Sequence, residues 1–160
     1  MSEKKEVTQE LIRLPKMLNI PQRFATGEAM GRFLSELRDN KRLMANVCPK
    51  CGRKQIPPRE VCAECRVEAT DWVEVGPEGT IVTVDIIYYA SPDPLTGESR
   101  NVPYNSCRIL LDGCKGFETF WHECIETDPE KIKAGTRVRP KWAENRKGDI
   151  TDIEYFEVIE

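Results

Sequence analysis

Four cysteines are the residues of this 160-residue chain whose type and spacing most clearly indicate chemistry. They form two Cys-x-x-Cys pairs separated by ten residues: Cys48, Cys51, Cys62 and Cys65. Two such pairs, each on a tight turn, can converge on one tetrahedral metal ion. The sequence therefore predicts a metal site. Because all four ligands are cysteines, the site is closed to water and substrate, which is typical of a structural rather than a catalytic metal.

The four thiolates suit zinc, and they also suit iron in a rubredoxin-like site. Gly52 follows the second cysteine and can adopt a positive φ, whereas Arg66 follows the fourth, so the second pair lacks the matching glycine. We therefore expect one structural zinc per chain, with iron as the alternative. A short ribbon has little core of its own, so metal binding of about 10–16 kcal/mol would fold it.

The remaining candidates for chemistry do not form a recognisable site. Cys107, Cys114 and Cys124 have spacings that fit no usual metal pattern, and we interpret them as small buried apolar residues. His122, the single histidine, suggests a general base. No nucleophile motif, glycine-rich phosphate loop or interpretable carboxylate pair accompanies it. The sequence thus predicts a chain that has no catalytic residues of its own.

Charge is unevenly distributed along the chain. The net charge of −3 argues against a general nucleic-acid coat protein. Between Lys41 and Arg66, however, seven basic residues stand against two acids. This stretch is either a solvated face or a docking place for an anionic group. The N-terminus, MSEKKEVTQE, is too polar for a signal peptide, and no long apolar run occurs, so we expect a cytoplasmic protein with reduced thiols.

The chain before the cysteines predicts one amphipathic helix. It begins after Thr26, a possible N-cap, and is expected to end near Met44. Its apolar stripe has helical spacing: Met30, Phe33, Leu34 and Leu37. Residues 1–25 carry scattered apolar positions interrupted by Pro15 and Pro21, so this segment packs on the body of the protein or wraps a partner.

After the cysteines the period changes to the alternation of strands. Strands are predicted at 80–89, 106–111, 117–122, 137–143 and 150–159, with 72–75 leading into the first and a helical turn at 129–134. In the first strand, one face carries Val82, Val84, Ile86 and Tyr88. A helical turn between the third and fourth strands favours an OB-fold over an SH3-like barrel. The expected organisation is an extension and helix (1–45), a zinc ribbon (46–68) and an OB-fold (69–160).

Two features of the predicted barrel are candidates for contact with a ligand or partner. The long connection at 90–103 is either a contact loop or a hairpin tip without a fixed structure. Five aromatic residues on the predicted barrel could stack on nucleic-acid bases. They are Tyr88, Tyr89, Phe120, Trp121 and Trp142. Because the net charge of the chain is acidic, we interpret all five as core-packing residues.

These motifs resemble a bacterial and archaeal family that pairs a rubredoxin-like zinc ribbon with an OB-fold and was long catalogued as a domain of unknown function. The resemblance rests on Cys-Pro-Lys-Cys-Gly-Arg at 48–53, Pro-Pro-Arg at 57–59, Cys-Ala-Glu-Cys at 62–65, Trp-Val-Glu-Val at 72–75 and Gly-Thr-Ile-Val at 79–82. Further agreement lies at Pro-Tyr 103–104 and Asp-Pro-Glu 128–130. The similarity covers about residues 28–145 and is weak at both ends of the chain.

The resemblance implies a function that the composition does not show. Members of this family are typically non-catalytic accessory subunits of thiolase-type acyl-CoA enzymes. One such member is the small subunit of benzoylsuccinyl-CoA thiolase, and relatives act on other acyl chains. Such subunits bridge or complete the catalytic subunit and help hold coenzyme A. By this resemblance, Arg53, Lys54 and Arg59 are the expected contacts to the coenzyme A phosphates. The alternative is a module that binds single-stranded nucleic acid.

Overall fold

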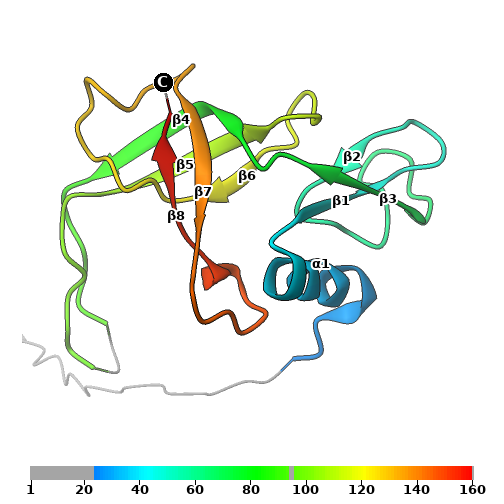
Figure 1. Cartoon of the computed structure of the whole chain (residues 1–160), viewed down its shortest axis with the longest axis horizontal. Coiled ribbons are helices and arrows are strands. Elements are labelled where there is room, and N and C mark those ends of the chain that lie inside the picture. The colour runs from blue at the N-terminus through cyan, green and yellow to red at the C-terminus, as the bar shows by residue number, and fades with distance from the viewer. Residues whose placement is uncertain (1–23, 94–95, 160) are drawn as a thin grey trace, which may run out of the picture.

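A computed structural model describes residues 24–93 and 96–159, and it confirms the predicted fold class (Figure 1). One helix precedes a small sheet at one end of the molecule and a β-barrel at the other. The predictions made for residues 1–23 lie outside the described part of the chain. The elements are α1 (Gly27–Asn40), β1 (Leu43–Val47), β2 (Lys54–Gln55), β3 (Asp71–Val75), β4 (Gly79–Ile87), β5 (Tyr104–Leu111), β6 (Phe120–His122), β7 (Arg137–Trp142), η1 (Ile150–Asp152) and β8 (Ile153–Val158).

Helix α1 begins after Thr26, as predicted, but it ends at Asn40 and not near Met44. Lys41 follows with a φ of 54°, and its backbone N–H donates to the carbonyl of Glu36, which closes the helix with a left-handed cap. The next residues leave the helix because β1 pairs with β3 along all five of its positions. Pairing between segments distant in sequence therefore overrides the local helical pattern. No helix in the described residues is long and apolar enough to span a membrane.

The small sheet carries the cysteine segment. Its strand order is β2-β1-β3, with antiparallel pairing throughout. Because Leu43 pairs with Val75, the sheet includes residues that come before and after the predicted metal segment 46–68 in the sequence. The stretch predicted to lead into the barrel, 72–75, is thus a strand of the ribbon sheet.

The second sheet is the barrel. Its strand order is β6-β5-β4-β7-β8, and a parallel bridge between Cys124 and Phe156 joins its two ends. Between β6 and β7 the chain makes a helical turn, in which the N–H of Ile132 donates to the carbonyl of Asp128 over 3.0 Å. This order and the position of the turn are those expected of an OB-fold.

Strand β4 buries the predicted face only after a β-bulge. Ile81 is buried, and the pairing register with β5 shifts between Ile81 and Thr83. This bulge turns Val82 outward, where it is 44% exposed, while Val84 and Ile86 still pack against the core. A bulge places one extra residue in the strand and so breaks the alternation on which the prediction relied.

The aromatic residues divide into a buried and an exposed group. Phe120 is fully buried and Trp142 packs against the core, as predicted. The core-packing interpretation is wrong for Tyr88, Tyr89 and Trp121, which are 69%, 76% and 65% exposed. The tyrosines lie just beyond the end of β4, and Trp121 faces outward because successive residues of a strand alternate between its faces.

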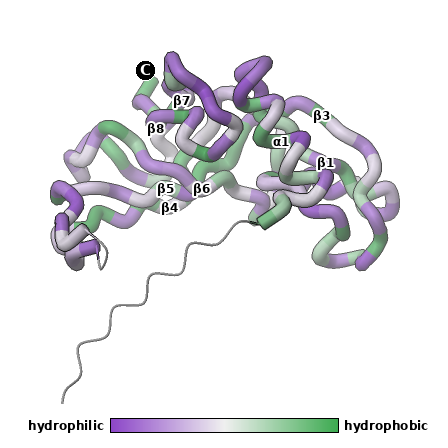
Figure 2. Tube along the Cα trace, turned by 90° about the horizontal axis from the view of Figure 1, so that it is seen from below, coloured by the Kyte–Doolittle hydropathy of each residue, from purple (hydrophilic) through white to green (hydrophobic). Residues whose placement is uncertain are grey.

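A single apolar core joins the helix, the ribbon sheet and the barrel. Phe33 of α1 meets Phe120 of β6 edge to face, with ring centroids 6.2 Å apart. Leu43 of β1 belongs to the same cluster. In Figure 2, hydrophobic segments run along the barrel strands, and the loops at the periphery are mostly hydrophilic. The helix therefore packs on both sheets at once.

The three cysteines outside the metal segment are buried, as predicted. Cys107 and Cys124 lie in the barrel, where Cys107 is fully enclosed. Burial raises the pKa of the Cys114 thiol to about 11, so this group stays protonated at neutral pH. These thiols behave as small apolar side chains of the core.

Candidate metal centre and adjoining pocket

The first Cys-x-x-Cys pair lies on a tight turn that follows β1. The N–H of Cys48 donates to the carbonyl of Arg53, and the N–H of Gly52 donates to the carbonyl of Cys48, both over 2.9 Å. Gly52 adopts a φ of 70°, the left-handed conformation that glycine takes without strain. This backbone arrangement directs both cysteine side chains to the same side of the turn.

The second pair repeats this arrangement. The N–H of Cys62 donates to the carbonyl of Val67, and the N–H of Arg66 donates to the carbonyl of Cys62, again over 2.9 Å. Arg66 stands where Gly52 stands in the first pair, and its φ is 55°. The missing glycine noted in the sequence is thus replaced by an arginine in the left-handed conformation, which carries backbone strain.

The structure brings the four predicted cysteines together. Their sulfur atoms all lie within 4.8 Å of one another, and those of Cys51 and Cys62 are 3.8 Å apart. Four sulfurs at zinc bond lengths of about 2.3 Å in a tetrahedron stand about 3.8 Å apart, so the donor set fits one zinc ion. No other group of three or more metal-ligating side chains occurs in residues 24–93 and 96–159. The cluster therefore supports a structural zinc.

The thiols of this cluster influence one another strongly. Burial opposes ionisation of Cys48, but backbone N–H groups of Cys51 and Lys50 outweigh it and lower the pKa of Cys48 to about 7. The hydrogen bond to Cys51, together with burial, raises the pKa of Cys65 to about 12. Thiolates this close repel one another, and a dication at their centre removes that conflict.

Two buried amide side chains hold the segment between the cysteine pairs. Asn46 of β1 donates through Nδ2 to the carbonyl of Arg59 and accepts through Oδ1 from the Arg59 N–H. Gln55 of β2 accepts from the N–H of Ala63 over 3.3 Å, next to the second pair. Both amides are fully buried. This network was not predicted from the sequence, although a polar residue inside the apolar run of β1 is a signal of such a buried amide.

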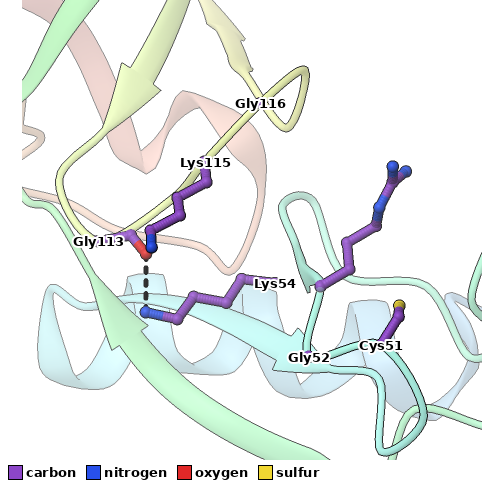
Figure 3. Close-up of a pocket in the computed structure, with 7 residues that line it drawn as sticks. Cys51, Gly52, Lys54, Gly113, Lys115 and Gly116 are labelled. Atoms are coloured by element: carbon purple, nitrogen blue, oxygen red, sulfur yellow. Dashed lines mark hydrogen bonds between the residues drawn. The ribbon is translucent and has the colours of Figure 1, made fainter.

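A pocket of about 400 Å³ lies between the first cysteine turn and the loop that joins β5 to β6 (Figure 3). Lys54 points across it, and its Nζ donates to the carbonyl of Gly113 over 2.7 Å. Lys115 extends from the facing loop. The lining residues are Cys51, Gly52, Arg53, Lys54, Gly113, Lys115 and Gly116. We call this site the lysine pocket.

The three basic residues predicted to contact phosphates are not all in this pocket. Arg53 and Lys54 line it, whereas Arg59 does not. Arg53 donates to Glu118 over 3.0 Å and to Glu64 over 3.1 Å, so carboxylates offset its charge. Lys54 and Lys115 form no ion pair within the described residues and supply the net positive charge. Lys115 could not be found from the sequence because only the folded chain brings its loop to the ribbon.

His122 lies in a packing environment. Its ring stacks on Phe120 with centroids 6.0 Å apart and tilts against Phe156 at 5.6 Å. Its Nδ1 is 3.3 Å from the carbonyl of Glu123. These contacts fix the orientation of the ring at the edge of the core.

Comparisons with known proteins confirm the predicted family resemblance. Residues 36–71 match the family described as "ChsH2, rubredoxin-like zinc ribbon domain". The fold is similar to that of an Ltp2-ChsH2(DUF35) aldolase, with a TM-score of 0.59 and 20% identity over 85% of this chain and 97% of that one. It is also similar to a DUF35-family protein of unknown function from Sulfolobus solfataricus, with a TM-score of 0.58 and 20% identity over 82% and 84% of the two chains. No curated protein matches in sequence.

Proposed function

We propose that this chain is a zinc-binding accessory subunit of an acyl-CoA enzyme, in which a thiolase-type partner supplies the catalytic residues. The observation that best supports this proposal is the match of residues 36–71 to the ChsH2-type ribbon, together with a fold similar to that of the ChsH2(DUF35) aldolase. The donor set of four cysteines supports a metal with a structural role. The small subunit of benzoylsuccinyl-CoA thiolase is one specific form of this proposal.

In this role, zinc acts through the backbone that it holds. The first cysteine turn supplies Cys51, Gly52 and Arg53 to the wall of the lysine pocket. A bound ion between the two cysteine pairs would fix this wall relative to β2, which carries Lys54. Arg53 also links this wall to the opposite side of the pocket, because its partner Glu118 lies in the β5–β6 loop. The metal thus stabilises a binding surface and takes no part in bond making.

We further propose that the lysine pocket holds phosphate groups of coenzyme A. Lys54 and Lys115 offer two ammonium groups, and a phosphate binds such donors through charge-assisted hydrogen bonds. Gly113 and Gly116 have no side chain to block a close approach to the backbone. Of the residues expected from the resemblance, Arg53 and Lys54 keep this assignment, and Lys115 takes the place of Arg59.

The second candidate function is binding of single-stranded nucleic acid. The exposed rings of Tyr88, Tyr89 and Trp121 favour it, since bases stack on such rings. It predicts binding that weakens steeply with salt. Failure of a labelled oligonucleotide to bind at low salt would remove it.

Co-expression with the thiolase-type protein of the same host tests the main proposal. We expect an untagged catalytic subunit to co-purify stoichiometrically, with about one zinc per accessory chain, and acyl-CoA turnover to require both proteins. Full turnover without this chain would refute the accessory role. Calorimetric titration of the complex with coenzyme A tests the pocket separately. The double variant Lys54→Gln/Lys115→Gln should bind at least tenfold more weakly, whereas the exposed control Lys133→Gln should bind as the wild type does.

A further inference from the structure

The barrel exposes several large aromatic side chains. Tyr88 and Tyr89 stand at the start of the long connection between β4 and β5, and Val102, which is 46% exposed, stands near its end. In Figure 1 this connection projects from the barrel on the side opposite the ribbon sheet. Trp121 faces outward from β6. We call these residues, with Tyr104 of β5, the aromatic face.

Tyr88 lines one groove of the barrel together with Ile86 and Pro129, and two other members of the aromatic face, Tyr104 and Trp121, line a second groove of about 610 Å³. Ile87 lies opposite Tyr104 in the β4–β5 ladder, and both line the second groove. Trp121 and Ile150 line it from β6 and η1. Apolar side chains from four elements therefore gather here without being covered by the described part of the chain. An uncovered cluster of this kind is typical of a docking surface.

Two rings of the aromatic face, those of Trp121 and Tyr104, are held in place by neighbouring side chains. The Nε1 of Trp121 donates to the hydroxyl of Ser106. The guanidinium of Arg100 lies 4.0 Å from the centre of the Tyr104 ring and is anchored by an ion pair with Glu123. Because these contacts already restrict the side chains, a partner loses little conformational entropy by binding them. Trp, Tyr and Arg are also the residues that most often contribute large binding energies at protein interfaces.

The charges around the aromatic face indicate the kind of partner. The acids near it outnumber the two arginines, Arg100 and Arg108. Asp85 lies on the same face because it pairs with Ser106, a groove residue. The other acids are Glu98 in the connection between β4 and β5, and Glu123 and Glu154, which line the groove. This balance repels a polyanion and is complementary to a protein surface whose apolar centre has a basic rim.

We propose that the aromatic face is the docking surface for the catalytic subunit, through an apolar patch rimmed by Lys or Arg on that subunit. This inference rests on the proposed accessory function and adds the place of contact. The lysine pocket lies at the ribbon, so docking through the barrel leaves it open to ligand. The accessory chain would then hold the partner at one end and an anionic ligand group at the other.

The test measures the dissociation constant between the full accessory chain and the purified catalytic subunit. We expect Tyr88→Ala/Tyr89→Ala and Trp121→Ala each to raise it at least tenfold, and Glu98→Lys to slow association several-fold. The control Phe117→Ala removes a ring that is 97% exposed in the β5–β6 loop, and it should change the dissociation constant less than twofold. Equal zinc content and melting temperature in all variants would establish that they are folded.

Three results would overturn this proposal. Wild-type affinity in both aromatic variants would show that the catalytic subunit docks elsewhere. A loss of affinity in Phe117→Ala as large as that in the aromatic variants would indicate that the catalytic subunit contacts the ribbon end of the molecule. Salt-dependent binding of labelled oligo-dT that is weakened by Trp121→Ala would assign the face to nucleic acid. If the wild-type chain itself binds no catalytic subunit, the proposed function fails first, and this outcome is distinct from wild-type binding that survives the aromatic substitutions.

Discussion

The conformation of the two cysteine turns predicts a specific energetic effect of substituting Gly52. Its φ is 70°, and a Cβ built at this position meets no atom within 4 Å. The cost of Gly52→Ala therefore comes from the backbone conformation alone, which is about 1 kcal/mol for an L-residue in the left-handed region. Because metal binding and folding of the ribbon are coupled, this cost weakens zinc binding by roughly fivefold.

The equivalent position in the second turn should respond with the opposite sign. Arg66→Gly removes strain at a φ of 55°, but glycine also gains entropy in the unfolded chain, so the net benefit is about 0.5 kcal/mol. Zinc affinity should rise roughly twofold. Competition with a chromophoric chelator under reducing conditions measures both changes, and Arg66→Ala controls for loss of the side chain. Unchanged affinity in Gly52→Ala, or weaker binding in Arg66→Gly, would refute this reasoning.

Three further predictions concern the metal, a buried amide and pH. Cys48→Ser should lower the zinc content below about one tenth of the wild type, measured by atomic absorption, because a tetrahedral site loses a thiolate. Asn105→Ala should lower stability by about 3 kcal/mol, or roughly 10 °C in Tm, because its side chain satisfies the N–H and carbonyl of Cys124 in the barrel. The hydrogen bond from Arg137 lowers the pKa of Asp112 below 3.8, so this pair stabilises the fold above that pH and the effect is lost as pH falls. Asp112→Asn should therefore lose up to about 1 kcal/mol at pH 7, because the pair is half exposed, and progressively less as the pH falls below 3.8, measured by urea unfolding.

The sequence predicted the elements that depend on local or strongly periodic signals. The paired cysteine spacing led to the cluster, since two tight turns converge whatever surrounds them. Alternation identified β5, whose Cys107, Ile109 and Leu111 are all buried. The helical turn predicted between the third and fourth strands of the barrel led to the OB-fold.

The features that the sequence did not reveal depend on contacts between distant segments. The bulge at Val82 and the early end of α1 both arise from pairing with strands far along the chain. Lys115 reaches the ribbon only because the barrel closes beside it. The exposure of Trp121 follows from which face of β6 meets Phe33, and this requires the position of the helix.

The shared core has a consequence for how this chain can be divided or recombined. Phe33 of α1 contacts Phe120 of the barrel, while Leu43 of the ribbon sheet belongs to the same apolar cluster. A ribbon excised at the cysteine segment would leave α1 with one uncovered side and would open the barrel core to water. Grafting this ribbon onto another barrel therefore requires transplanting the helix and its contact residues as well. Recombination between relatives should preserve the described chain as one unit.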